Sequence, residues 1–480
     1  MNLRSTFAGF AFLLAAVLLF SVPSAYAQTD PPPSESFDSK YDEWLEKAKE
    51  GVRGPIAEWH YYWHEGFHIV SRRENVRIKI GGKIAVDGGY VGADDELERA
   101  FPDLEGSEID FRRLSVSASG TIKALSALKR EAEAIEEPGP SFMDAIGSYS
   151  KYDDLEFKVE IDFANVRDIQ DIWIRFPSIP LLRPFTFGHM KEPFSLERYT
   201  SGTNATFMEI ALSTRAFSAG RNIGILYDKV ALEERMTYAV GGFLNTGSFT
   251  DIGEATDRIS EANGFNLTAR VTGLPRYGDE GARLFHLGLS YSHQFRDESS
   301  DAAGADFRTR PESRLTDDRL VDTGELFVDG VDLINPELAI VSGPLSFQGE
   351  YFHAFTDAED DLNFWGYYVY GSYFLTGEHR NYDTSRGVFS RVRPKHNFRP
   401  FQGGWGAWEL ALRYSYVDLN DEDIKGGKER NVTAALNWYL TPHYRFTLNY
   451  IRAHVKDRTT PPAVDDGIAD IFQARFQISY

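Results

Sequence analysis

The sequence predicts an all-β protein, a transmembrane antiparallel β-barrel of sixteen strands with a short N-terminal helical lead-in. Three observations support this prediction. Apolar and polar residues alternate with a period of two along most of the chain. The alternating runs reach about 9–11 residues, the length of a tilted membrane-spanning strand. Aromatic residues are abundant, with 24 Tyr, 35 Phe and 8 Trp, which suits β-sheet and the aromatic girdle at a membrane interface.

Residues 1–27 have the pattern of a secretory signal peptide. Arg4 supplies the positive charge, residues 10–22 form the apolar core, and Ala25-Tyr-Ala27 is a small-x-small cleavage site. The apolar run of about thirteen residues is shorter than the roughly 20 that a spanning helix needs. We therefore expect an exported protein.

Charge and cysteine content narrow the classes of partner. The chain has 51 Lys and Arg against 72 Asp and Glu, for a net charge of −21, which argues against non-specific nucleic-acid binding. Cysteine is absent, although export would permit disulfides. A hydrogen-bonded sheet or a large core must therefore hold the fold, and we expect no cofactor and no nucleic-acid partner.

Residues 28–58 read as a periplasmic linker and a short helix. Asp30-Pro-Pro-Pro-Ser34 is a stiff linker. Apolar residues at helical spacing follow, and Gly51 and Gly54 end the pattern. We expect this helix to pack on the end of the barrel or on a neighbouring subunit.

Residues 59–68 place His60, His64 and His68 four apart, with Glu65 beside one of them. On a helix this spacing would gather a metal site. The aromatic residues and Gly66 suit a strand or turn better, so we favour an aromatic interface patch over a metal site.

The barrel is expected to occupy 59–480, and its alternation begins at Val76. In one run, Leu155, Phe157, Val159, Ile161 and Phe163 alternate with Glu156, Lys158, Glu160 and Asp162. Candidate strands lie at 76–87, 109–123, 155–166, 169–176, 183–190, 221–228, 236–244, 264–272, 284–295, 337–342, 345–355, 364–375, 406–418, 429–440, 443–454 and 470–480. Sixteen is an even number, as closure of a bacterial barrel requires, and a barrel of this size keeps an aqueous channel.

Connections are expected to differ between the two ends of the barrel. Short turn signals occur at Gly343-Pro344 and at 440–443, and long polar loops occupy the other end. The segment 296–336 is rich in Asp, Glu and Arg and lacks periodicity. We interpret it as an external loop whose main role is a solvated cap.

The stretch Phe185–Ile225 is the exception among the connections. Between two strand-like runs it passes about thirty polar residues, which is too long for a normal connector inside a packed domain. It carries a mixed set of charges: Lys191, Arg198, Arg215, Arg221, Glu192, Glu197 and Glu209. In a soluble protein this would be a surface loop. In a membrane barrel it would fold inward around 189–220 and narrow a pore.

If the apolar set faces lipid, the alternating cations face the lumen. They are Arg77, Lys79, Lys83, Arg113, Lys123, Arg270, Arg413 and Arg475. Acidic residues belong to the same inward set: Glu156, Glu160, Asp162 and Glu409. Each cation therefore either lines an aqueous path or braces the wall through an inward salt bridge.

The sequence resembles the phosphate-selective porin O and P family of outer-membrane proteins. The likeness rests on Gly188–Glu197, Thr200-Ser-Gly, Phe207-Met-Glu, Arg221-Asn-Ile-Gly224, Arg310-Pro-Glu-Ser, Val321-Asp-Thr-Gly, Gly343–Tyr351, Tyr373–Glu378, Gly406–Tyr414 and Asn437-Trp-Tyr-Leu440. The resemblance implies a homotrimer in outer-membrane lipid, a third loop folded into the lumen, and passive uptake of anions such as phosphate or polyphosphate. By this resemblance the anion pathway comprises Lys191, Arg198, Arg215 and Arg221 at the narrowest point, with Arg77, Lys79, Lys83, Arg113, Arg270 and Arg413 along the wall.

Other functions stay open at this point. The acidic residues of the inward set favour a general or other-solute porin without phosphate selectivity as the first alternative. A barrel enzyme is the second, because His286, Ser290 and Ser292 share a face, although no acidic partner is evident in the sequence. An exported soluble β-protein that binds carbohydrate or a surface partner is the third, and it would extract without detergent.

Overall fold

The computed structural model describes residues 59–71, 76–123, 154–164, 168–176, 184–296 apart from 248, 251, 261 and 263, and then 304–357 and 361–480. The expected signal peptide (1–27) and lead-in (28–58) lie outside the described residues. The described part of the chain belongs to one compact unit, Glu58–Tyr480, and none of its helices is both long and apolar enough to cross a membrane.

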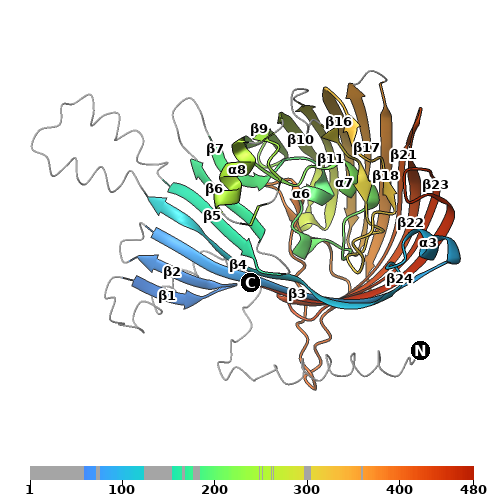
Figure 1. Cartoon of the computed structure of the whole chain (residues 1–480). Coiled ribbons are helices and arrows are strands. Elements are labelled where there is room, and N and C mark those ends of the chain that lie inside the picture. The colour runs from blue at the N-terminus through green and yellow to red at the C-terminus, as the bar shows by residue number, and fades with distance from the viewer. Residues whose placement is uncertain are drawn as a thin grey trace, which may run out of the picture. The chain divides into compact units, whose positions relative to one another are not determined.

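Sixteen antiparallel strands form a closed barrel (Figure 1). They are β3 Val76–Ala93, β4 Gly106–Lys123, β5 Asp154–Asp162, β6 Asp168–Phe176, β7 Phe185–Lys191, β8 Arg221–Ala231, β9 Met236–Leu244, β10 Phe265–Gly278, β11 Arg283–Phe295, β16 Gly330–Ser342, β17 Leu345–Asp357, β18 Asn363–Phe374, β21 Ala407–Asp421, β22 Ile424–Tyr439, β23 Tyr444–Arg458 and β24 Val464–Ser479. All sixteen candidate strands are confirmed. The greatest differences are at strand ends, as in β16, which starts at Gly330.

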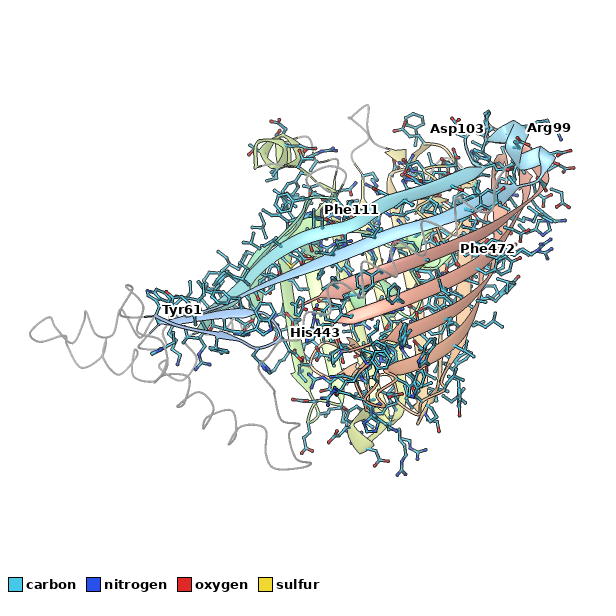
Figure 2. All side chains as sticks on the ribbon, turned by 90° about the horizontal axis from the view of Figure 1, so that it is seen from below. Tyr61, Arg99, Asp103, Phe111, His443 and Phe472 are labelled. Atoms are coloured by element: carbon cyan, nitrogen blue, oxygen red, sulfur yellow. The ribbon has the colours of Figure 1, made fainter. Side chains whose placement is uncertain are left out.

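The first and last strands of the barrel close the sheet. Residues 83–93 of β3 pair with 469–479 of β24. The other part of the same edge is taken by a hairpin of β1 Trp59–Trp63 and β2 Phe67–Ser71, in which Phe67–Val70 pair with residues 77–80. The aromatic stretch is therefore a hairpin extending the sheet beyond the end of β24, with Tyr61 far from Arg99 and Asp103 at the opposite end of the barrel (Figure 2).

The barrel wall is apolar outside and polar inside. On β11 the outward residues Leu287 and Leu289 are 44% and 48% exposed, whereas the inward His286 and Ser290 are fully buried. Phe111 and Phe472 lie on the same outer face of the wall (Figure 2). A soluble sandwich would bury the apolar set, so this arrangement identifies a wall that faces lipid.

The connections differ from the expected alternation of short and long. We call the end that holds the C-terminus the C-terminal rim and the other end the loop rim. Turns at the C-terminal rim include 343–344 and 440–443, as expected, but the connection 375–406 lies there too and contains the hairpin of β19 Tyr382–Asp383 and β20 Val388–Phe389. At the loop rim, β21 and β22 are joined by only 422–423.

Two long connections, the one that precedes β16 and the one at 375–406, pack inside the barrel. Both lie against the segment that joins β7 to β8. Buried Leu320, Val321 and Val328 share one apolar cluster with Leu212 and with wall residues. The prediction that 296–336 is mainly a solvated cap is therefore wrong. Its apolar residues pack with distant parts of the chain that a local pattern does not reveal.

Candidate functional site

The segment predicted to form the constriction, which covers residues 192–220 between β7 and β8, lies within the ring of strands (Figure 1), and we call it the constriction loop. It contains α6 Leu196–Tyr199, the 3-10 turn Gly202–Asn204 and α7 Leu212–Phe217. Wall side chains hold its backbone. Glu350 on β17 accepts hydrogen bonds from the amides of Leu196 and Glu197 at 3.0 and 2.8 Å, and Ser415 on β21 accepts one from Leu212 at 3.0 Å.

Strands nearer the C-terminus hold the middle of the same loop. Asn437 on β22 donates to the carbonyl of Thr206 at 2.9 Å, and Arg475 on β24 donates to that of Met208 at 2.6 Å. The loop is thus docked on the wall formed by β17 to β24. Its charged residues Arg198 and Arg215 keep partly exposed side chains.

One carboxylate of the loop collects four arginines. Glu209 pairs with Arg112 at 2.7 Å, Arg215 at 2.9 Å, Arg475 at 2.9 Å and Arg314 at 3.7 Å. We call these five residues the Glu209 cluster. Only Arg475 has a second carboxylate among these pairs, Asp87 at 2.6 Å, so positive charge is in excess.

The arginines of the Glu209 cluster shift the pKa of the carboxylate and of one another. Burial raises the pKa of Glu209, but Arg112, Arg475, Arg314 and Arg215 outweigh burial and hold that pKa well below its usual range. Burial, Arg112 and other nearby arginines lower the pKa of Arg314 to about 10, although Glu209 opposes this. Glu209 and Arg314 are therefore both charged at neutral pH. The arginine side chains are between 8% and 41% exposed, so part of this charge faces the lumen.

A β-bulge turns two consecutive arginines of β4 toward the lumen. The register between β3 and β4 shifts after Ala85, which pairs with Arg113, whereas Val86 pairs with Phe111. Arg112 is the extra residue and reaches Glu209, while Arg113 reaches Asp162 at 3.2 Å. Bulges commonly redirect a side chain in this way.

The wall from β3 to β8 adds further paired cations. Lys83 and Lys158 share Glu160 at 2.6 and 2.8 Å, and Arg221 pairs with Asp171 at 2.8 Å. These three cations are between 19% and 27% exposed. Lys191, at the end of β7, instead donates to the carbonyls of Arg198 and Thr200 at 2.7 and 3.0 Å.

The remaining candidate residues lie elsewhere. Arg77 and Lys79 occupy the part of β3 that pairs with β2, beyond the end of β24. Lys123 is the last residue of β4. Arg270 is buried on Glu337 at 2.8 Å, and Arg413 is buried between Glu197 at 3.1 Å and Glu312 at 2.6 Å. Arg270 and Arg413 brace the interior.

The possible catalytic cluster has an acidic partner that sequence inspection missed. His286 and Ser290 both contact Glu337, at 3.2 and 2.9 Å, beside the bidentate Arg270. Ser290 also accepts a hydrogen bond from the amide of Ser195 in the constriction loop at 3.2 Å. The serine hydroxyl thus donates to a carboxylate already bound to arginine, an arrangement that anchors the loop and does not activate a nucleophile.

The three histidines of the N-terminal segment fall on the β1–β2 hairpin. His68 bonds to the carbonyl of His64 at 2.9 Å and stacks on Tyr62, with ring centroids 4.7 Å apart. Across the described residues, His, Cys, Asp and Glu form no group of three or more suited to a metal ion.

A family model decides the class of this barrel. The model for phosphate-selective porin O and P matches residues 79–480. The chain belongs to this family. The porin is therefore an outer-membrane protein, and its family and fold are those of a channel.

The individual proteins that resemble this porin share only part of its sequence. An uncharacterized protein of Caulobacter vibrioides is 31% identical over 301 residues, an alignment that spans 61% of this chain and 58% of that protein. Porin O of Pseudomonas aeruginosa is 25% identical over 322 residues, which span 61% of this chain and 69% of Porin O. Among solved structures, the anion-selective porin from Comamonas acidovorans is 11% identical, with 84% of this chain and 100% of that chain covered and a TM-score of 0.49.

Sequence reasoning missed two arginines of the porin's Glu209 cluster. Strict alternation places Arg112 outside the barrel, and Arg314 lies in a segment without periodicity. The adjacent pair Arg112-Arg113 was the one available signal, because a charged residue on the lipid face is costly.

Proposed function

We propose that this porin passes small anions, with phosphate among them, through its lumen by way of the Glu209 cluster and the neighbouring basic residues. The observation that supports the proposal is the convergence of four arginines on one carboxylate in the constriction. Guanidinium groups replace part of an anion's hydration through charge-assisted hydrogen bonds. Because the four arginines share Glu209 and only Arg475 has a second carboxylate, Asp87, their positive charge is incompletely neutralised.

The proposed path favours transit over tight binding. Lys83, Lys158 and Arg221 each have a carboxylate partner, which weakens their hold on a passing anion. Conduction requires sites that an ion can enter and leave. We therefore assign Lys191, Arg198, Arg215 and Arg221 to the narrow region, as the sequence suggests, and add Arg112 and Arg314.

Reversal potentials in a planar bilayer test this proposal. Across a salt gradient we expect reversal potentials that indicate a preference for anions. We also expect added phosphate to reduce the chloride current. Replacing Lys191 and Arg215 together by Glu is expected to reduce or invert the preference, since one unit charge at 4 Å changes an ion's energy by about 1 kcal/mol even in water. Lys229→Glu is a control, because Lys229 is exposed on β8 near the C-terminal rim.

Two outcomes would contradict parts of the proposal. Equal permeation of phosphate and chloride without competition would favour a general anion porin. Unchanged selectivity in the double variant would reject these residues as the constriction while leaving the barrel intact. We further propose a homotrimer in outer-membrane lipid, by analogy with the family, which mass measurement of the detergent-solubilised protein tests.

A further inference from the structure

Basic residues face each other on the outer surface of the wall, near the loop rim. In the register of β22 with β23, Lys428 lies opposite Lys456 and Arg430 lies opposite His454. Each of them alternates along its strand with buried inward residues. We call these four residues the basic ladder. Like charges directly opposite each other destabilise a pair of strands, so an anion bound between them would offset their repulsion.

Nearby carboxylates compensate the basic ladder only in part. Asp466 on β24 accepts hydrogen bonds from both ladder residues of β23, from Lys456 at 2.7 Å and from Nε2 of His454. Lys428 makes two ion pairs, each at 3.7 Å, with aspartates of β21 and β23. The side chains of Lys428 and Lys456 remain 37% and 42% exposed, so both can still approach an anion.

Arg430 has no carboxylate within ion-pair distance in the described part of the chain. Its Nε and one Nη donate to Nδ1 of His454, at 3.0 and 2.7 Å. Because Nε2 of His454 faces Asp466, the imidazole proton lies on Nε2 and Nδ1 is the acceptor. Two donors of the guanidinium therefore share one lone pair of a neutral ring. The planar fork of Arg430 matches the two oxygens of a phosphate or carboxylate far better.

The basic ladder lies at the level of an aromatic girdle. Arg430 pairs across strands with Tyr416, whose ring centroid lies 5.2 Å from that of Trp365 and 5.9 Å from that of Tyr367. Such aromatic residues mark the boundary between the apolar band of a barrel and water. The next outward residue of β22 toward the C-terminal rim is the apolar Val432, which is 44% exposed. The ladder therefore borders the apolar band, at the depth of lipid headgroups.

This basic stretch of the boundary is local. Toward the loop-rim ends of β10, β11 and β17, the outward residues are Phe265, Phe295 and Phe355, all exposed. The girdle is thus aromatic on those strands and basic on β22 and β23. A surface that contacted only acyl chains and neutral interface would not need this difference.

The lengths of the connections orient the basic ladder across the membrane. Apart from 375–406, the described connections at the C-terminal rim are only two to four residues long: 232–235, 279–282, 343–344 and 440–443. Barrels of the outer membrane have short turns at the periplasmic end and longer loops outside. The loop rim is therefore the outer end, and the basic ladder borders the outer leaflet.

We propose that the basic ladder binds the anionic headgroup of lipopolysaccharide, the glycolipid of the outer leaflet. A headgroup phosphate accepts the bidentate fork of Arg430, and Lys428 and Lys456 act on it as point charges. The acyl chains then lie along the apolar wall that begins at Val432. This site is on the outer surface, so the proposal does not depend on which solute passes through the lumen.

Native mass spectrometry of the delipidated, detergent-solubilised full barrel tests this site, with Kdo₂-lipid A as the probe. We expect the native barrel to retain bound Kdo₂-lipid A. Replacing Lys428 and Arg430 together by Gln should weaken binding roughly tenfold or more, because each lost charge-assisted hydrogen bond accounts for about that factor. Arg430→Lys should give an intermediate affinity, since it keeps the charge and loses the fork.

The matched control is Lys229→Gln, which removes an exposed cation of β8 near the opposite rim and should leave binding unchanged. Heat-modifiable migration in SDS gels verifies that every variant is folded. Equal binding by the native barrel and the double variant overturns the proposal. Two competitors at the concentration of the probe complete the test. Displacement by phosphatidylglycerol would show a site for any anionic lipid, and displacement by inorganic phosphate a site for the free anion; either result overturns the proposal.

Discussion

At the scale of single residues, the lumen of this porin owes one of its arginines to an irregularity in a strand. The bulge in β4 brings Arg112 to the same side of the wall as Arg113. Without it, the period of two would send Arg112 into lipid. The one extra residue of the bulge thus places the charge of Arg112 in the lumen, where it can attract anions, and not on the lipid face, where it would be costly.

Replacing Arg112 by Met is expected to weaken anion preference. One of the four arginines on Glu209 is lost, and the energy of a passing anion rises by about 1 kcal/mol, or roughly fivefold in permeability ratio. Reversal potentials measure the change, with Lys229→Met as the control. A preference equal to that of the native porin would place the ion path away from Glu209.

The pH dependence of selectivity is expected to be flat through neutrality. Burial and the nearby arginines lower the pKa of Arg198 to about 9, although Glu209 opposes this. A cation with a lowered pKa loses its charge as pH rises through that value, so anion preference should hold from about pH 6 to 8 and decline near pH 9. Selectivity recorded across this range tests it. A midpoint near 6.5 would instead implicate a histidine.

Sequence alone identified part of this site, and the missing part has a physical cause. Alternation correctly turns Arg113 inward, because β4 is regular on that side of the bulge. It does not distinguish Arg270 from a pathway residue, since its partner Glu337 lies on another strand. Pairing across strands depends on register, which one strand's pattern does not contain.

At the scale of elements, the constriction loop is held mainly by side chains of the wall. Arg413 is central, because it donates to the carbonyl of Glu209 at 3.1 Å and pairs with Glu197 and Glu312. Two segments far apart in the sequence therefore depend on one guanidinium.

Replacing Arg413 by Met is expected to destabilise the barrel by about 3–5 kcal/mol, because two buried carboxylates lose their cation. The midpoint of urea unfolding in detergent measures the loss. Arg452→Met is the matched control, since Arg452 makes an exposed pair with Asp470 on the outer face and such pairs contribute about 0–1 kcal/mol. Equal stability of the two variants would contradict a structural role for Arg413.

The elements themselves were largely predictable from the sequence, whereas their packing was not. A strand such as β9, Met236–Leu244, is marked by local composition and turns. The hairpin at 382–389 packs on Leu196 of the constriction loop, and nothing near Tyr382 in the sequence indicates this partner. Loop packing is decided by contacts between distant segments.

At the scale of the whole molecule, closure of the barrel and attachment of the hairpin are separate. Residues 83–93 of β3 pair with β24, whereas 77–80 pair with β2. The two partners occupy different lengths of one strand edge.

Deleting residues 59–71 is therefore expected to leave a closed, conducting barrel. The sixteen strands keep all their mutual pairings, because the hairpin contributes none of them. Single-channel conductance and heat-modifiable migration in SDS gels measure the outcome. A deleted chain that fails to migrate as a folded barrel would show that the hairpin is needed for closure.

The edge of β3 also carries a risk for the chain before the barrel closes. Its closing partner, Val464–Ser479, lies far along the chain from β3. Until these two strands pair, each keeps an unsatisfied edge of the kind that invites pairing with other chains. A chaperone that shields β3 during transit across the periplasm would thus protect the step on which solubility depends.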